Sequence, residues 1–209
     1  MNLGGAVKHL VLSVGFVVGT ASIAEASSIT LVNTDATWLA TNVAPAAGWN
    51  TNLLFNTAGW TNAFVFDTQP EPCFMGASCI WYDGQFSATQ FVWLRQTFTV
   101  SGPIAVATLL GGFDDDGDVY VNGVQVLHDT SGQAEFNGWG ALDVTPYLVQ
   151  GVNLIAVFGS DNVARFGHNH TFVASLQAQT PTAVPEPASF LQLAPGLAGL
   201  IWLRRARRS

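Results

Sequence analysis

Basic residues are scarce in this chain, and most of those present lie near its two ends. The 209 residues include 7 Lys and Arg against 14 Asp and Glu, which gives a formal charge of −7 at pH 7. Between Ser27 and Thr180 only Arg95 and Arg165 oppose twelve acids, a net charge of −10. Such a domain has no basic patch to neutralise phosphates, so the composition excludes nucleic acid as a partner.

Short catalytic motifs are also missing. The chain has no Gly-x-Ser-x-Gly nucleophile elbow, no His-Glu-x-x-His zinc motif and no phosphate-binding loop. Two carboxylates flanking a sugar would make a glycosidase, but nothing singles out such a pair among the acids, Glu71 and Glu135 included. We therefore expect a protein that is not an enzyme, with a small glycoside hydrolase as the alternative.

The first 26 residues have the layout of a secretory signal peptide. Lys8 and His9 precede an apolar stretch from Leu10 to Val18, and Ala24 and Ala26 form a small-x-small signal-peptidase site. The apolar stretch is too short to span a bilayer comfortably, which favours cleavage after Ala26 over an uncleaved anchor helix. We expect this N-terminal signal helix to be removed by signal peptidase.

The other end combines an apolar run with arginines. The run Ala188–Leu203 has 16 residues. As a helix it would extend about 24 Å, short of a bilayer core of about 30 Å, although local thinning would let it span. The arginines that follow resist translocation and would stay in the cytoplasm while the exported domain lies outside. They are Arg204, Arg205, Arg207 and Arg208.

Pro185, Glu186 and Pro187, followed by the apolar run and the arginines, resemble the PEP-CTERM sorting signal. The resemblance covers Val184–Ser209. It implies that an exosortase, a membrane transpeptidase of Gram-negative bacteria, processes a tail held transiently in the inner membrane. Such bacteria usually make an extracellular polysaccharide, and the mature protein would reach the cell surface or the medium. A plain tail anchor or an amphipathic terminal helix is the alternative.

These two segments divide the chain into four parts. The predicted parts are a signal peptide over 1–26, a domain over 27–180, a linker over 181–184 and a sorting tail over 185–209 that contains a transmembrane-type helix. Within the domain, runs that are apolar or alternate with polar residues are bounded by turn residues, and no amphipathic helix stands out. This pattern predicts an all-β sandwich. The runs cover 28–32, 63–66, 89–100, 104–113, 118–127, 153–160 and 170–177.

The clearest local signal is Asn122-Gly123 between two Val-rich runs. It predicts a β-hairpin, because a type I′ turn needs positive φ at both central residues. Val119 and Val121 would then share one face of the strand, and Tyr120 would lie on the other. Farther along, residues 143–151 read as a short helical turn with Thr145 as its cap and Pro146 in its first turn.

Four segments of the domain resemble the galactose-binding-like jelly roll. They are Trp93–Phe98, Phe113–Gly123, Asp143–Leu148 and Gly151–Val157. That module accompanies β-galactosidases, rhamnosidases and other sugar-handling proteins. The resemblance implies a jelly-roll β-sandwich, and it implies no particular activity because the matched residues are mostly structural.

The densest cluster of charge consists of Asp114, Asp115, Asp116 and Asp118, with Gly117 among them. Hard oxygen ligands at short spacing suit Ca²⁺, and repulsion between the carboxylates favours a cation. A structural calcium is therefore the one cofactor that the sequence suggests. The run lacks the spacing and the distal Glu of an EF-hand, so a solvated turn bent at Gly117 is the alternative.

Two further residue pairs suggest local chemistry. Cys73 and Cys79 form an even pair in an exported chain, which favours a disulfide over free thiols. His168 and His170 would share a strand face and could ligate zinc together with His128 or Asp129. A pair of histidines at the entrance or rim of the strand is the favoured alternative.

Six tryptophans lie in the domain, and most are expected in the core because Trp is a large apolar residue. Trp139 lies between two glycines and is expected in a loop. Loops at one end of a sandwich commonly carry binding sites. We therefore take Trp139, Asp129 and Arg165 as candidate sugar-binding residues.

The sequence thus predicts an exported surface or matrix protein that binds extracellular polysaccharide without catalysis. A purely structural or adhesive protein that binds no sugar is the main alternative. A solvent-facing tryptophan beside polar groups would favour binding. A concave pocket with convergent titratable groups would favour a hydrolase.

Overall fold

A computed structural model describes residues 26–66, 73, 76–84, 90–130, 137–161 and 170–181. These residues belong to one folded unit, Ala26–Thr182. None of the helical structure in this part of the chain is long and apolar enough to cross a membrane. The signal peptide up to Glu25, including Ala24, and the sorting tail from Pro185 both lie outside the described residues.

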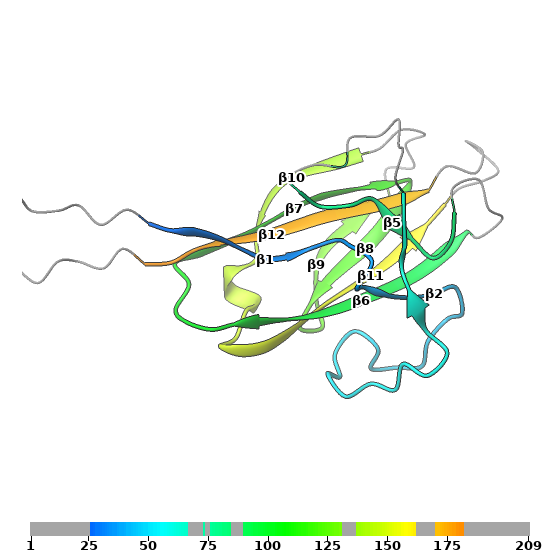
Figure 1. The fold of residues 1–209 in the computed structure, drawn as a ribbon, viewed down its shortest axis with the longest axis horizontal. Helices are drawn as coiled ribbons and strands as arrows, with labels where there is room; N and C mark the ends of the chain where they lie inside the picture. The colour runs from blue at the N-terminus through cyan, green and yellow to red at the C-terminus, as the bar shows by residue number, and fades with distance from the viewer. Residues whose placement is uncertain are drawn as a thin grey trace, which may run out of the picture. The chain divides into compact units, whose positions relative to one another are not determined.

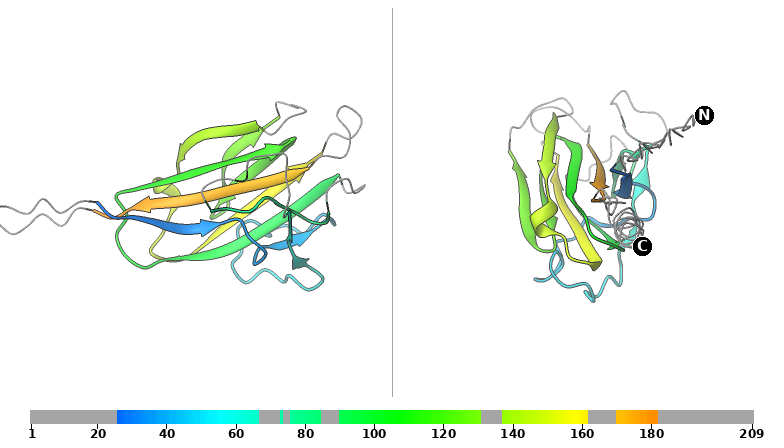
Figure 2. Two further views of the ribbon diagram at one scale, coloured as in Figure 1. Left: turned by 45° about the horizontal axis from the view of Figure 1, so that its top comes forward. Right: turned by 90° about the vertical axis from the view of Figure 1, so that its left-hand side faces the viewer.

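The unit is an all-β sandwich of two antiparallel sheets, seen as two layers in the right-hand view of Figure 2. The first sheet has the order β10–β7–β12–β5–β4, and β1 pairs with the same edge of β12 as β5 (Figure 1). Its strands are β1 (Ser28–Asn33), β4 (Phe64–Val65), β5 (Ile80–Trp81), β7 (Val106–Asp114), β10 (Asn137–Asp143) and β12 (Thr171–Gln179).

The second sheet has the order β3–β2–β6–β11–β8–β9. Its strands are β2 (Leu39–Thr41), β3 (Thr61–Asn62), β6 (Phe91–Val100), β8 (Asp116–Val121), β9 (Val124–Asp129) and β11 (Gly151–Ser160). The core fills the space between the sheets, because alternate side chains of each strand point inward. Val92 and Leu94 of β6 are fully buried there, as are Phe172 and Leu176 of β12.

The predicted hairpin joins β8 to β9. Asn122 has φ 49° and Gly123 has φ 84°, so both central residues adopt the left-handed conformation that a type I′ turn needs. The Asn122 side chain donates to the Tyr147 carbonyl and to Asn153 Oδ1, both at 2.8 Å, and accepts from Leu154 N–H at 2.9 Å. Asn122 therefore supplies both the turn conformation and a tie to β11.

Several local predictions need correction. β10 replaces the predicted loop around Trp139, since Asn137–Asp143 pair with β7. The turn after β10 is a 3-10 helix, η1 (Thr145–Tyr147), and its N-cap is Val144 rather than Thr145. The Thr145 hydroxyl instead accepts from Ala107 N–H at 2.7 Å and donates to Asp143 Oδ1 at 2.6 Å, which ties the turn to β7.

The predicted disulfide between Cys73 and Cys79 is present, with Cα atoms 5.4 Å apart. Cys79 is fully buried beside β5, whereas Cys73 is exposed. The bridge closes a chain separation of six residues and so holds the approach to β5 against the core. For a loop this short, the loop-closure model gives a stabilisation of about 2 kcal/mol.

The two ends of the sandwich differ. β1 begins and β12 ends at one of them, where Ser28 pairs with Gln179 and Thr180 N–H donates to the Ser27 carbonyl at 3.0 Å. We call this the terminal end; it lies at the left of Figure 1. At the other end β11 finishes and β12 begins. Most of the described acids lie at or next to the strand ends found there. They are Asp83, Asp114, Asp115, Asp116, Asp129 and Asp161.

Candidate functional site

A row of four side chains crosses the outer face of the second sheet. Trp93 of β6 pairs with Phe158 of β11, Phe158 pairs with Asp118 of β8, and Asp118 pairs with His128 of β9. Directly opposed residues in antiparallel strands lie on the same face. The row therefore sets two aromatic rings beside a carboxylate and an imidazole.

The aromatic part of this row extends to Phe91, the first residue of β6. The Phe91 and Phe158 rings are nearly parallel, with centroids 6.1 Å apart, and the Trp93 ring is tilted by 41° against Phe158 at 5.2 Å. Phe91 is 45% exposed, and the other two are half-buried. We call Phe91, Trp93 and Phe158 the aromatic face. Its rings are held by one another and remain open to solvent in part.

Asp118 organises the polar side of the row. Its Oδ1 lies 2.6 Å from His128 Nδ1 and accepts from Gln125 Nε2 at 2.9 Å, while Tyr120 Oη donates to its Oδ2 at 3.4 Å. Burial, together with the Asp118 charge, raises the pKa of Tyr120 above its ordinary value. His128 is 64% exposed and the Asp118 side chain 19%, so polar atoms of this group reach solvent.

A second row lies next to the first and is covered. Arg95 pairs with Ala156, and Ala156 pairs with Tyr120. Residues 42–60, the covering loop, lie over this row. The Arg95 guanidinium sits 5.5 Å from the Phe55 ring centroid and donates to the Asn52 carbonyl at 3.1 Å. Burial lowers the pKa of Arg95.

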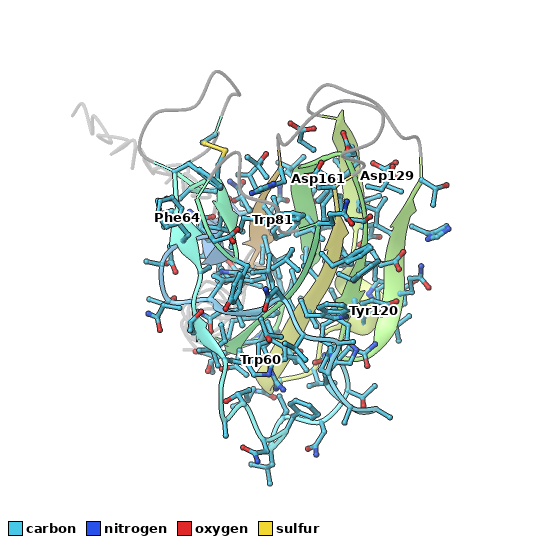
Figure 3. All side chains as sticks on the ribbon, turned by 90° about the vertical axis from the view of Figure 1, so that its right-hand side faces the viewer. Trp60, Phe64, Trp81, Tyr120, Asp129 and Asp161 are labelled. Carbon is cyan, nitrogen blue, oxygen red and sulfur yellow. A yellow bond between two sulfur atoms is a disulfide. The ribbon has the colours of Figure 1, made fainter. Side chains whose placement is uncertain are left out.

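The covering loop is fixed to the sheet at two other points. The Trp49 ring meets Tyr120 edge-on at 5.8 Å. A Cβ on Gly123 would overlap the Thr51 side chain, so the hairpin tip and the loop are in close contact. The loop thus lies beside the aromatic face, and Figure 3 shows Tyr120 on the second sheet and Trp60 at the end of the covering loop.

This arrangement has the chemistry of a sugar-binding surface. Aromatic faces pack on the apolar faces of sugar rings, and the carboxylate, amide, imidazole and phenol groups beside them exchange hydrogen bonds with hydroxyls. An open depression of 460 Å³ runs along β9 and is lined by Gln125, Val126, Leu127 and His128. None of these four lining residues carries a carboxylate, whereas glycoside hydrolysis requires two.

Of the three residues predicted to bind sugar, the two that the structure describes lie on different sheets. Trp139 lies in β10, and its half-buried ring packs on the core residues Phe113 and Phe172, at 5.5 and 6.2 Å between centroids. Asp129 lies at the end of β9, opposite Gly117. Arg165 is outside the described residues. Trp139 therefore has the position of a residue that stabilises the fold.

The four clustered aspartates also separate. Asp114 ends β7 and is 1% exposed, and Asp115 is fully buried, so neither lies in a solvated turn. Asp118 lies on the outer face of β8. Gly117 is in β8 rather than in a bend, and a Cβ there would overlap the Phe113 ring. Within the described ranges, no three Asp, Glu, His or Cys side chains are arranged to hold a metal ion.

His170 lies at the entrance to β12, as expected, but inside the core rather than at a rim. It is fully buried, its ring stacks on Trp81 at 5.1 Å, and its Nδ1 is 3.3 Å from Asp161 Oδ2. Asp83 Oδ1 lies 3.9 Å from His170 Nε2. Figure 3 shows Trp81 between the sheets and Asp161 near the ends of the strands. His168 is outside the described residues.

Sequence reasoning missed the aromatic face, although one signal could have found it. Phe91, Trp93 and Arg95 alternate with Val92 and Leu94, so one face of β6 is aromatic and basic while the other is aliphatic. A strand in a two-layer sandwich has only one core face. Two large rings on the opposite face then indicate a surface with a function.

The sequence matches no protein-family model and no curated protein. Similar solved structures include a β-glycosidase from Bacteroides vulgatus, 18% identical with a TM-score of 0.46 over 72% of this chain and 20% of that one. A β-glucuronidase from glycoside hydrolase family 2 is 19% identical with a TM-score of 0.43, over 77% of this chain and 18% of that one.

A third similar structure is a Streptomyces avermitilis α-L-rhamnosidase complexed with L-rhamnose, 20% identical with a TM-score of 0.42, over 73% of this chain and 14% of that one. The chain thus spans a fifth or less of the length of each of the three. The likeness is weak, and the fold and the site described above rest on the strands and side chains of this chain alone.

Proposed function

We propose that the sandwich is a galactose-binding-like jelly roll whose outer face binds an extracellular polysaccharide without catalysis. The observation that carries the proposal is the row Trp93, Phe158, Asp118 and His128, which sets two adjoining rings beside hydrogen-bonding groups on one open face. Phe91, which is 45% exposed, adds a third adjoining ring to that face.

The charge of the surface narrows the ligand to neutral or amino sugars. Arg95 is the only Lys or Arg among the described residues, and it is 4% exposed. No described guanidinium or ammonium group is therefore available to pair with a uronate, a sulfate or a phosphate. Asp116 and Asp118 on the same face would repel such anions.

The route to the cell surface is a separate part of the proposal. The signal peptide over 1–26 directs export, and an exosortase-type transpeptidase processes the tail over 185–209 at the inner membrane. What supports it is the order of Pro185-Glu186-Pro187, the apolar run and the terminal arginines. Pulse-labelling in a Gram-negative host with and without the transpeptidase would test it: a tail retained equally in both strains would exclude processing.

Binding is tested by calorimetry with neutral oligosaccharides and with the exopolysaccharide of the host. The decisive variant is Phe91→Ala, and Phe64→Ala is its matched control, because Phe64 is equally exposed at 46% but lies on the other sheet. We expect Phe91→Ala to weaken binding about five- to thirty-fold and Phe64→Ala to leave it unchanged. Equal effects of the two variants would exclude the aromatic face as the site.

The alternatives give different results in the same experiment. Absence of heat with every glycan, under conditions where the fold is intact, would favour the structural or adhesive protein. Release of reducing ends from any of these sugars on prolonged incubation would identify a hydrolase. Loss of that release in Asp118→Asn would place the reaction on this face.

A further inference from the structure

An apolar groove crosses the terminal end of the sandwich. A depression of 450 Å³ lies between β1 and the end of β6, and a second of 210 Å³ lies between β6 and the segment after η1. The two share Val100, Gly102, Pro103 and Ile104 and therefore form one continuous surface. Ile29 borders the first and Val149 the second, with exposed fractions of 41% and 56%.

The described segments of the terminal end also carry no charged side chain. No acidic or basic residue occurs in 26–31, 99–108, 144–153 or 176–181, the segments that make it. In the sequence, Glu25 and Asp143 are the charged residues that directly border these segments. The net charge over residues 27–180 is −10, and the charged side chains that produce it thus lie mostly away from the terminal end.

The sequence beyond this end reaches an apolar run quickly. Ala188, where the run of 16 residues begins, lies seven positions after Pro181. Seven residues span at most about 25 Å when fully extended. If the run enters a bilayer, the terminal end is therefore held within about 25 Å of the lipid headgroups.

We propose that the terminal end of the sandwich rests on the lipid bilayer while the tail is inserted. The proposal rests on the membrane retention put forward above. Ile29, Val106, Val149 and Val152, each 41–56% exposed, would then pack at the headgroup boundary instead of remaining in water.

Repulsion between the acidic side chains and anionic lipids favours the same orientation, with the terminal end on the bilayer. Anionic lipid headgroups repel carboxylates within about a Debye length, so the acid-bearing end is disfavoured at the surface. The uncharged end meets no such repulsion. The aromatic face, on the flank of the second sheet, stays accessible to a glycan in this orientation.

The orientation can be measured by lipid-dependent fluorescence quenching on the full chain in vesicles of phosphatidylcholine and phosphatidylglycerol. A fluorophore on Val152→Cys marks the terminal end, and one on Thr130→Cys, also exposed, marks the other. The native cysteines are bonded to each other and take no label. The ten residues of β11 set the two ends roughly 30 Å apart. We expect headgroup nitroxides to quench the label at 152 at least several-fold more than the label at 130.

Adding carboxylates to the groove tests whether its lack of charge causes the orientation. Ile29→Asp with Val149→Asp places two carboxylates on the groove, and we expect it to abolish the excess quenching at Val152. Val43→Asp with Leu54→Asp adds the same charge on the covering loop, where both residues are 69% or more exposed, and should leave it intact. Equal losses in the two variants would show that net charge alone is responsible and would overturn the proposal.

The remaining outcomes distinguish the membrane retention of the tail from the orientation of the sandwich. Failure of the full chain to associate with vesicles would refute the membrane retention of the tail, and this proposal with it. Association with equal quenching at both labels would refute the orientation alone. Quenching or cross-linking between labels at Val152 without vesicles would assign the groove to a second copy of the chain.

Discussion

Trp139 and Trp93 have different roles, so replacing each should change a different property: Trp139→Ala should lower stability, and Trp93→Ala should lower affinity for glycan. Trp139→Ala removes a half-buried ring that packs on Phe113 and Phe172 and closely covers Gly111. Full removal of a core Trp costs about 3–5 kcal/mol, so a half-buried ring should cost about 2–3 kcal/mol. For a domain of this size that lowers Tm by roughly 5–10 °C. Affinity of the folded fraction for glycan should not change.

Trp93→Ala should behave in the opposite way. Its ring lies on the aromatic face and touches only Phe91 and Phe158 among the described rings, so the free energy of unfolding should fall by about 1 kcal/mol. Kd for glycan should rise about five- to thirty-fold, the equivalent of 1–2 kcal/mol. Calorimetric scanning and titration on the same two samples measure both quantities. A Trp139→Ala variant with the wild-type Tm and no binding would refute the placement of these rings.

Two further predictions concern the second sheet. Gly159→Ala should lower the free energy of unfolding, measured by urea titration, by about 1–3 kcal/mol, because its Cβ would lie 2.6 Å from a Trp81 ring carbon. Gly102→Ala is the control, because a Cβ at that position would have nothing within 4 Å. Equal losses in the two variants would contradict the packing of Gly159 on Trp81. Burial and the Asp118 charge raise the pKa of Tyr120, so the stability that its neutral phenol provides is fully present below about pH 10 and is lost as pH rises through the folded value. Asp118→Asn should move the Tyr120 titration part of the way back, as followed by its ring carbon resonance, and an unmoved titration would exclude the contact.

The sequence was most informative where local geometry and burial act together. Asn122-Gly123 predicted the hairpin because few residue pairs adopt two positive φ values, and the structure has both. The apolar run over 153–160 predicted a strand, and β11 is an inner strand of its sheet. Alternation correctly divided Val119 and Val121 from Tyr120.

The failures have a common physical origin in tertiary contacts. β10 was missed because Gly138 and Gly140 read as turn residues, whereas here they flank a Trp whose ring lies over Gly111. β5 has only two residues, and no periodicity can be read from so short a segment. Alternation within β6 could have placed Phe91 and Trp93 on one face, but Phe158 joins them only through the register between β6 and β11.

The pairing of β12 also determines how the domain carries a load. This strand faces β7 through nine residue pairs and β1 through five, all antiparallel, and the chain leaves it at Thr180. A pull on Thr180 directed along the strand would shear these ladders together instead of opening them one bond at a time. A polymer held on the other sheet would transmit its tension through the packed core to the same strand. With the C-terminal segment held and a glycan bound as proposed, the load between them would pass through β12 and the core.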